Sequence, residues 1–142
     1  MLILLRKTLV FVFIFLLIFP ATVKAKTLTG KVGSVKYASD TQKGFELTKI
    51  YAEHAYNTKS GAFYGFFLSN DSTMAVFLTK TGDEIYALNP NVFRRYMREW
   101  VKGLKKIYGT SAVSVNLKES DGTTIGKATI SIFSGIIKIK LY

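Results

Sequence analysis

The sequence predicts an α+β fold in which an antiparallel β-sheet of about six strands packs against one long amphipathic helix, with a second helix near residues 45–58 left open. Three observations lead to this class. Short runs of apolar residues lie on both sides of the centre of the chain. Segments rich in Asn, Asp and Gly separate these runs, as in hairpins. One longer segment places its apolar residues at helical spacing.

The first 25 residues are typical of a cleaved secretory signal peptide. Arg6 and Lys7 precede the eleven-residue apolar run Leu9–Phe19, and Val23 and Ala25 are small residues where a signal peptidase reads the chain. An uncleaved anchor is the alternative, but eleven helical residues span only about 16 Å, against a hydrocarbon core of about 30 Å. We therefore predict cleavage after Ala25 and release of the chain into the periplasm or the medium.

The remaining residues, 26–142, are expected to form a single α+β domain with no transmembrane segment. The whole chain has 20 basic and 9 acidic residues and a formal net charge of +11. Removal of the three cations of the leader leaves +8. The chain has no cysteine, which excludes disulfides and thiolate metal sites.

The beginning of the mature chain gives weak signals. An imperfect alternation predicts a first strand over Lys31–Ala38. Residues 45–58 have one apolar stripe at helical spacing, although a strand over Phe45–Ala52 competes with this helix. The stripe consists of Leu47, Ile50, Tyr51, His54 and Ala55.

Three apolar runs follow: Ala62–Ser69, Thr73–Lys80 and Glu84–Leu88. The segments between them, Asn70-Asp71-Ser72 and Thr81-Gly82-Asp83, favour turns, so we predict two successive hairpins. The middle run is apolar on both faces, which indicates a central strand.

The clearest element is a helix from Pro90 to Ile107 or Tyr108. Asn89 is suited to cap its first turn, Pro90 fits the first helical position, and Gly109 ends it. One stripe is apolar: Phe93, Tyr96, Met97, Trp100, Val101, Leu104 and Tyr108. The other face carries six cations, Arg94, Arg95, Arg98, Lys102, Lys105 and Lys106, beside the single acid Glu99.

The last part of the chain predicts three antiparallel strands, over Ala112–Lys118, Thr124–Phe133 and Gly135–Tyr142. Turn signals at Asp121-Gly122 and Ser134-Gly135 separate them. Alternation of apolar and polar residues gives this part of the sheet one buried and one solvated face.

Motifs for catalysis are lacking, so we expect no enzyme, no cofactor and no metal site. His54 is the only histidine. Its neighbour Glu53 points elsewhere on either a helix or a strand, so we expect His54 to be half-buried and structural. Most of the nine acids lie at predicted turns, and no phosphate-binding glycine loop is present. A small hydrolase using carboxylates or His54 remains an alternative.

The basic residues are the best candidates for contact with a partner. Cations spaced i, i+4 on one helix face repel each other, so an anionic partner would relieve a cost. Such a partner is an anionic membrane surface, a glycan or an acidic protein, whereas no specific signal points to nucleic acid. The predicted surface comprises Arg94, Arg95, Arg98, Lys102, Lys105, Lys106, Lys138 and Lys140.

These observations together predict a small exported, non-catalytic binding protein of the inhibitor or immunity type, acting in the cell envelope. An envelope structural or assembly component that pairs through an edge strand at Gly135–Tyr142 is the main alternative. Lys138 and Lys140 argue mildly against that alternative, because lysines discourage edge pairing.

Overall fold

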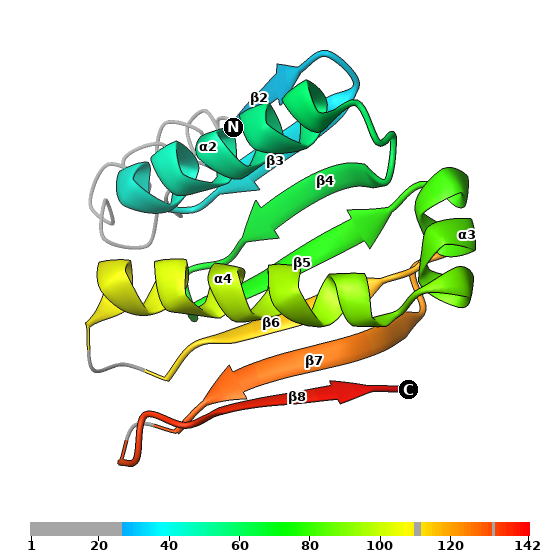
Figure 1. Ribbon diagram of the computed structural model, residues 1–142. Helices are drawn as coiled ribbons and strands as arrows, with labels where there is room; N and C mark the ends of the chain where they lie inside the picture. The colour runs from blue at the N-terminus through cyan, green and yellow to red at the C-terminus, as the bar shows by residue number, and fades with distance from the viewer. Residues whose placement is uncertain (1–26, 110–111, 132) are drawn as a thin grey trace, which may run out of the picture.

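The computed structural model describes residues 27–109, 112–131 and 133–142, and in this part of the chain three helices cover one face of a seven-stranded sheet (Figure 1). The strands are β2 (Leu28–Val32), β3 (Val35–Ser39), β4 (Phe63–Leu68), β5 (Thr73–Leu78), β6 (Ser114–Lys118), β7 (Thr124–Ile130) and β8 (Ile137–Leu141). The helices are α2 (Gln42–Thr58), α3 (Lys80–Leu88) and α4 (Asn91–Tyr108). The predicted signal peptide, residues 1–25, lies outside the described residues.

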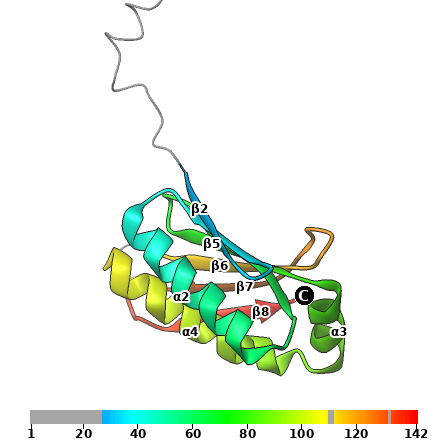
Figure 2. The same ribbon diagram turned by 90° about the horizontal axis from the view of Figure 1, so that it is seen from above.

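The sheet is mixed, which corrects the expectation of an antiparallel sheet. Its strands lie side by side in chain order, β2 to β8, and the pairs β3–β4 and β5–β6 are parallel. Parallel neighbours need a long crossover. Helix α2 is one crossover, and α3 with α4 is the other. Both run on the same face of the sheet (Figures 1 and 2). Because β3 and β5 point in opposite directions and both connections move the same way across the sheet, the two crossovers have opposite hands.

The predicted first strand is in fact a hairpin. Strands β2 and β3 pair antiparallel around Gly33 and Ser34, with Val32 opposite Val35. Gly33 takes a φ of +60°, a conformation that other residues rarely adopt. The expectation of one strand over Lys31–Ala38 was wrong because it continued through this turn.

Residues 45–58 form a helix, and the predicted stripe is buried only in part: Ala55 is buried, Leu47 and Tyr51 pack partly against the core, and Ile50 is exposed. Thr41 caps α2, and its hydroxyl oxygen accepts a hydrogen bond of 3.0 Å from the Gly44 amide. The buried residues are small: Gly44, Thr48, Ala52 and Ala55. Small residues bring α2 close to β3, since a Cβ at position 44 would lie 2.2 Å from Ser39 Oγ. His54 is consequently exposed, which corrects the expectation of a half-buried histidine.

The hairpin β4–β5 is confirmed, and β5 is a central strand as expected. The second predicted hairpin is wrong, because Glu84–Leu88 belongs to helix α3. Thr79 starts that helix: its hydroxyl oxygen accepts a hydrogen bond of 3.1 Å from the Gly82 amide. Thr81-Gly82-Asp83 therefore lies in a first helical turn instead of a loop.

The long helix is confirmed as α4, and its buried residues belong to the predicted stripe: Phe93, Met97, Trp100, Val101 and Leu104. Its start differs in one respect. Pro90 is the cap residue and makes no side-chain cap hydrogen bond. Asn89 contributes its backbone carbonyl, which accepts from the Val92 amide at 3.2 Å.

The core lies between this helix layer and the sheet. Phe63 is at its centre, with ring centroids 5.4 to 6.0 Å from those of Phe66, Phe93, Tyr96 and Trp100. The three C-terminal strands are confirmed, and β8 forms one edge of the sheet. Among the helices of the described residues, none has the length and apolar character needed to cross a bilayer.

Candidate functional site

The face of the sheet turned away from the helices carries all the lysines of the strands. The seven strands contain no Asp or Glu. Directly paired residues of neighbouring strands share a face. The pairing therefore places Lys127, Lys140 and Asn116 together, opposite the buried Ala128 and the half-buried Ile139. We call this surface the open face; its lysines are Lys31, Lys36, Lys118, Lys127, Lys138 and Lys140.

Three aromatic side chains cross the middle of the open face, and we call them the aromatic strip. Tyr64 and Phe67 come from β4 and Phe77 from β5. The Phe77 ring centroid lies 6.2 Å from that of Tyr64 and 5.6 Å from that of Phe67, both edge to face. Gly65 leaves room for the Phe67 ring, since a Cβ at position 65 would lie 2.7 Å from it. The strip is therefore an apolar region between the lysines of the open face.

Two lysines contact this strip directly. The Lys36 ammonium lies 5.2 Å from the Tyr64 ring centroid and donates a hydrogen bond of 3.3 Å to its hydroxyl. The Lys118 ammonium lies 6.0 Å from the Phe77 ring centroid. Cation–π contacts of this kind orient a lysine without neutralising it. Both positive charges therefore remain available to an anion.

The open-face lysines have no carboxylate partner within the described part of the chain, where the one ion pair joins Lys102 to Glu99 at 3.4 Å on α4. Two pairs of lysines stand directly opposite each other on neighbouring strands, Lys31 with Lys36 and Lys127 with Lys140. Like charges at such positions destabilise a sheet. An anion bound across the open face would remove this cost.

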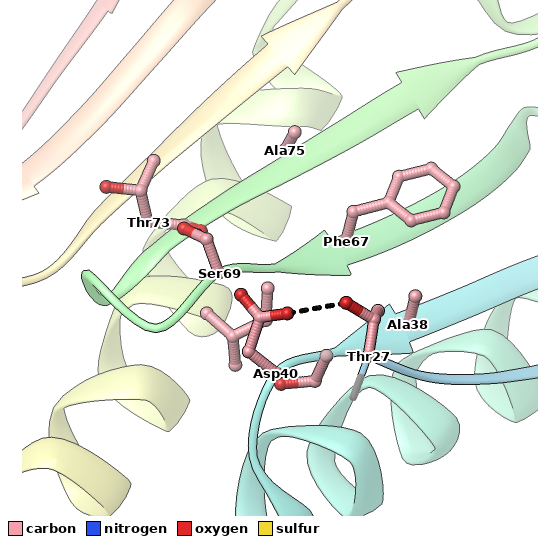
Figure 3. Close-up of a pocket in the computed structure, with 9 residues that line it drawn as sticks. Thr27, Ala38, Asp40, Phe67, Ser69, Thr73 and Ala75 are labelled. Carbon is pink, nitrogen blue, oxygen red and sulfur yellow. Dashed lines mark hydrogen bonds between the residues drawn. The ribbon is translucent and has the colours of Figure 1, made fainter. Parts of the chain in front are cut away.

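Two shallow depressions flank Phe67, because Ala38 and Ala75 on the adjoining strands are short. Figure 3 shows the first of them. It has a volume of about 310 Å³ and ends at Asp40, which accepts a hydrogen bond of 2.8 Å from the Thr27 hydroxyl. The other, about 300 Å³, is lined by Thr29, Gly30, Lys31, Lys36, Tyr37, Ala38 and Phe67. Both depressions are at the lower end of the volumes of ligand pockets. Their shape suits a surface contact better than an enclosed small molecule.

The structure does not bring the eight sequence-predicted cations together. Arg94, Arg95, Arg98, Lys102, Lys105 and Lys106 lie on α4, in the helix layer. Lys138 and Lys140 are on the open face, since their neighbours Ile137 and Ile139 pack against the core. The two groups are therefore separated by the sheet. Only Arg94 approaches β8, where its guanidinium donates to the Ile139 carbonyl at 3.5 Å.

Most acids near the turns are occupied by structural hydrogen bonds. The Ser69 hydroxyl donates to Asp71 and lowers the pKa of that carboxyl. The Thr123 amide donates to Asp121 at 2.9 Å and lowers the pKa of that carboxyl as well. Asp83 accepts from the backbone amide of Ser120 at 3.1 Å. Carboxyls with a lowered pKa stay ionised, so they are poor general acids.

Metal-ligating side chains do not cluster among the residues that the structure describes, where no group of three or more His, Asp or Glu could hold an ion. His54 is exposed on α2 and borders a small cavity that Tyr96 and Trp100 also line. The described residues therefore offer a basic and aromatic surface as the most developed candidate site.

Sequence reasoning included Lys138 and Lys140 in the predicted surface, but it did not place the open-face lysines on one face, and it missed the aromatic strip. A signal was present. The last three predicted strands contain no acid and carry Lys118, Lys127, Lys138 and Lys140, which indicates a sheet face of one charge. The sequence does not give the strand register, and only the register shows that these lysines share one face.

Comparisons with protein families, with curated proteins and with solved structures find no match. The function is therefore inferred from the chain itself.

Proposed function

We propose that the protein is an exported, non-catalytic module of the cell envelope that binds a polyanionic partner across the open face of its sheet. The observation that carries this proposal is that six lysines and no acid come from the seven strands and share one face. The helix layer already closes the other face of the sheet. The open face is thus the large surface left for a partner.

Electrostatic magnitudes favour an extended anion over a single small one. Each basic residue near an anionic surface contributes about 1 kcal/mol at moderate ionic strength. Six lysines across seven strands can contribute several times that amount only if the partner reaches all of them. The interaction should weaken strongly with salt, since the lysines are solvent-accessible.

A pair of charge-matched variants tests this proposal. The sheet variant carries Lys36→Glu and Lys127→Glu, and each new carboxylate faces a lysine, Lys31 or Lys140, on the next strand. The helix variant carries Arg95→Glu and Arg98→Glu on the exposed side of α4. Both variants have the same net charge, so only the place of the change differs.

Affinity is measured for long-chain inorganic polyphosphate, with neutral dextran as the blank. We expect the sheet variant to bind polyphosphate at least about 25-fold more weakly than the unaltered protein. The helix variant should lose only a few-fold, as its net charge predicts. Equal losses in the two variants would contradict a site on the open face, and a larger loss in the helix variant would move the site to α4.

Strand addition at β8 is the second candidate function, because β8 is an edge of the sheet. Arg94 binds the Ile139 carbonyl, so one acceptor of this edge is already engaged. Deletion of residues 137–142 should abolish partner capture in this case, whereas charge reversal on the open face should leave capture unchanged.

A further inference from the structure

The turn between β7 and β8 exposes two large apolar side chains. Phe133 is 94% exposed and Ile136 is 60% exposed. The turn lies at the end of the molecule opposite α3 (Figures 1 and 2). A phenylalanine held in water at a turn tip gives up the stabilisation that burial would provide. Apolar side chains exposed in this way are typical of contact surfaces.

The backbone amides of residues 133–136 have hydrogen-bond partners within this turn. The Ser131 hydroxyl oxygen accepts from the amides of Phe133 and Ser134 at 3.3 and 3.2 Å. The Gly135 amide donates to the Ser131 carbonyl at 2.8 Å, and the Ile136 amide donates to the Ser134 hydroxyl at 3.3 Å. Peptide groups that are already bonded lose little when water is removed. The tip is therefore suited to an apolar environment.

The two strands that this tip joins, β7 and β8, carry lysines on the open face. The chain has no acid from Gly122 to Tyr142, and this segment carries three lysines. Lys138 is two residues from Ile136, about 7 Å along the strand. Apolar groups of interfacial proteins reach about 5–10 Å into the boundary between headgroups and acyl chains. Insertion of the tip to that depth would bring the Lys138 ammonium to the level of the lipid phosphates.

We propose that the β7–β8 turn inserts Phe133 and Ile136 into the interface of an anionic lipid bilayer, while Lys138 and Lys140 bind the lipid headgroups. This inference rests on the proposed function and names anionic lipid as the polyanion. A soluble polymer would contact the lysines and leave Phe133 in water. A bilayer accommodates both the apolar tip and the cations next to it.

Vesicle binding tests the insertion. The full chain is expressed and its exported form is purified, so that all proteins compared share one N-terminus. Vesicles contain equal amounts of phosphatidylglycerol and phosphatidylcholine, or phosphatidylcholine alone. We compare Phe133→Ser with Leu88→Ser, because Leu88 is 87% exposed but lies on α3 at the other end of the molecule.

We expect Phe133→Ser to weaken binding to the anionic vesicles roughly tenfold or more. Leu88→Ser should bind like the unaltered protein, and vesicles of phosphatidylcholine alone should bind all of them weakly. Replacement of Lys138 and Lys140 by Ala should reduce anionic binding about fivefold for each lysine. Equal binding by Phe133→Ser and the unaltered protein would overturn the inference.

Tryptophan emission provides a second measurement. With Phe133→Trp, anionic vesicles should shift the emission to shorter wavelength, and lipids brominated on the acyl chains should quench it. Leu88→Trp should show neither effect. The native Trp100 is buried, so its emission is a constant background. A shift for position 88 and none for position 133 would refute insertion of the turn.

Polyphosphate binding separates this inference from the proposed function. Phe133→Ser should bind polyphosphate as the unaltered protein does. One outcome is that polyphosphate binds through the open face and anionic vesicles do not bind. In that case the partner is a soluble polymer: the membrane inference is wrong, and the proposed function stands. If neither ligand binds, both are wrong.

Discussion

At the scale of single residues, Gly82 lies where only a glycine fits. A Cβ at this position would lie 2.2 Å from the carbonyl oxygen of Ala62. That carbonyl also accepts the Thr79 amide at 2.9 Å, so α3 begins in contact with the backbone before β4. In the sequence, Gly82 indicates a turn. In the structure, it permits the close approach of α3 to the backbone at Ala62.

Gly82→Ala should therefore lower the free energy of unfolding by about 1–3 kcal/mol, because the backbone at Ala62 must move. Urea denaturation measures this change. Thr81→Ala is the control, since Thr81 is exposed in the same helical turn and alanine is the better helix former. Unchanged stability of Gly82→Ala would mean that α3 does not press against Ala62.

The raised pKa of Tyr51 leads us to predict a loss of stability in alkaline solution. Burial, with a smaller contribution from the charge of Glu99, raises the pKa of Tyr51 to about 12 from its ordinary value of 10.0. The folded chain thus keeps the phenol proton at a pH where the unfolded chain has lost it. This contribution to stability is complete below pH 10.0 and decreases as the pH rises to about 12.

The decrease should amount to about 2 kcal/mol between these two pH values. Urea denaturation at several pH values measures it. Tyr51→Phe has no phenol to titrate, so its stability should depend less steeply on pH in this interval. Parallel profiles for the two proteins would show that burial of Tyr51 does not control its protonation.

At the scale of secondary structure elements, β7 and β8 combine a destabilising pair with a surface for anions. Lys127 faces Lys140 directly, whereas Lys138 faces Thr129. The cross-strand repulsion is tolerated in the fold although a single substitution could remove it. Such a tolerated repulsion between Lys127 and Lys140 is consistent with a role of these charges in contact with an anionic partner.

Lys140→Glu should raise the free energy of unfolding by about 0.5–1 kcal/mol at low salt, because repulsion becomes attraction. The same change should weaken polyphosphate binding. Lys138→Glu is the matched control: it alters the charge equally but faces a threonine, so its effect on stability should be smaller. The two variants having equal stability would argue against the Lys127–Lys140 repulsion.

At the scale of the whole molecule, the described residues share one sheet and one core, and both begin at β2. We predict that protein recovered from the envelope of a cell expressing the full chain starts at Lys26. Intact-mass spectrometry checks this directly. A mass that includes Met1 would contradict cleavage, and recovery in the cytosol would contradict export.

The sequence by itself determined the elements whose signals are local. The apolar stripe from Phe93 to Leu104 indicated the long helix. Alternation in the last part of the chain indicated three antiparallel strands, which are shorter in the structure than predicted. Helix α3 was missed because Gly82 is a turn signal in the sequence, whereas in the structure it lies against the Ala62 carbonyl, a partner distant in the chain. The parallel pairs were missed because strand direction depends on where a crossover helix returns.

The positive charge, the absence of cysteine and the alternating lysines were likewise fixed by the sequence. Only the tertiary structure decided that the cations form two surfaces, one on α4 and one on the open face, since both crossovers bring their helices to the same side of the sheet. The register of seven strands then assembles Lys31 and Lys140, more than one hundred residues apart, on one face to which the strands contribute no acid. Residue spacing along a chain does not encode which face of a sheet a distant strand will share.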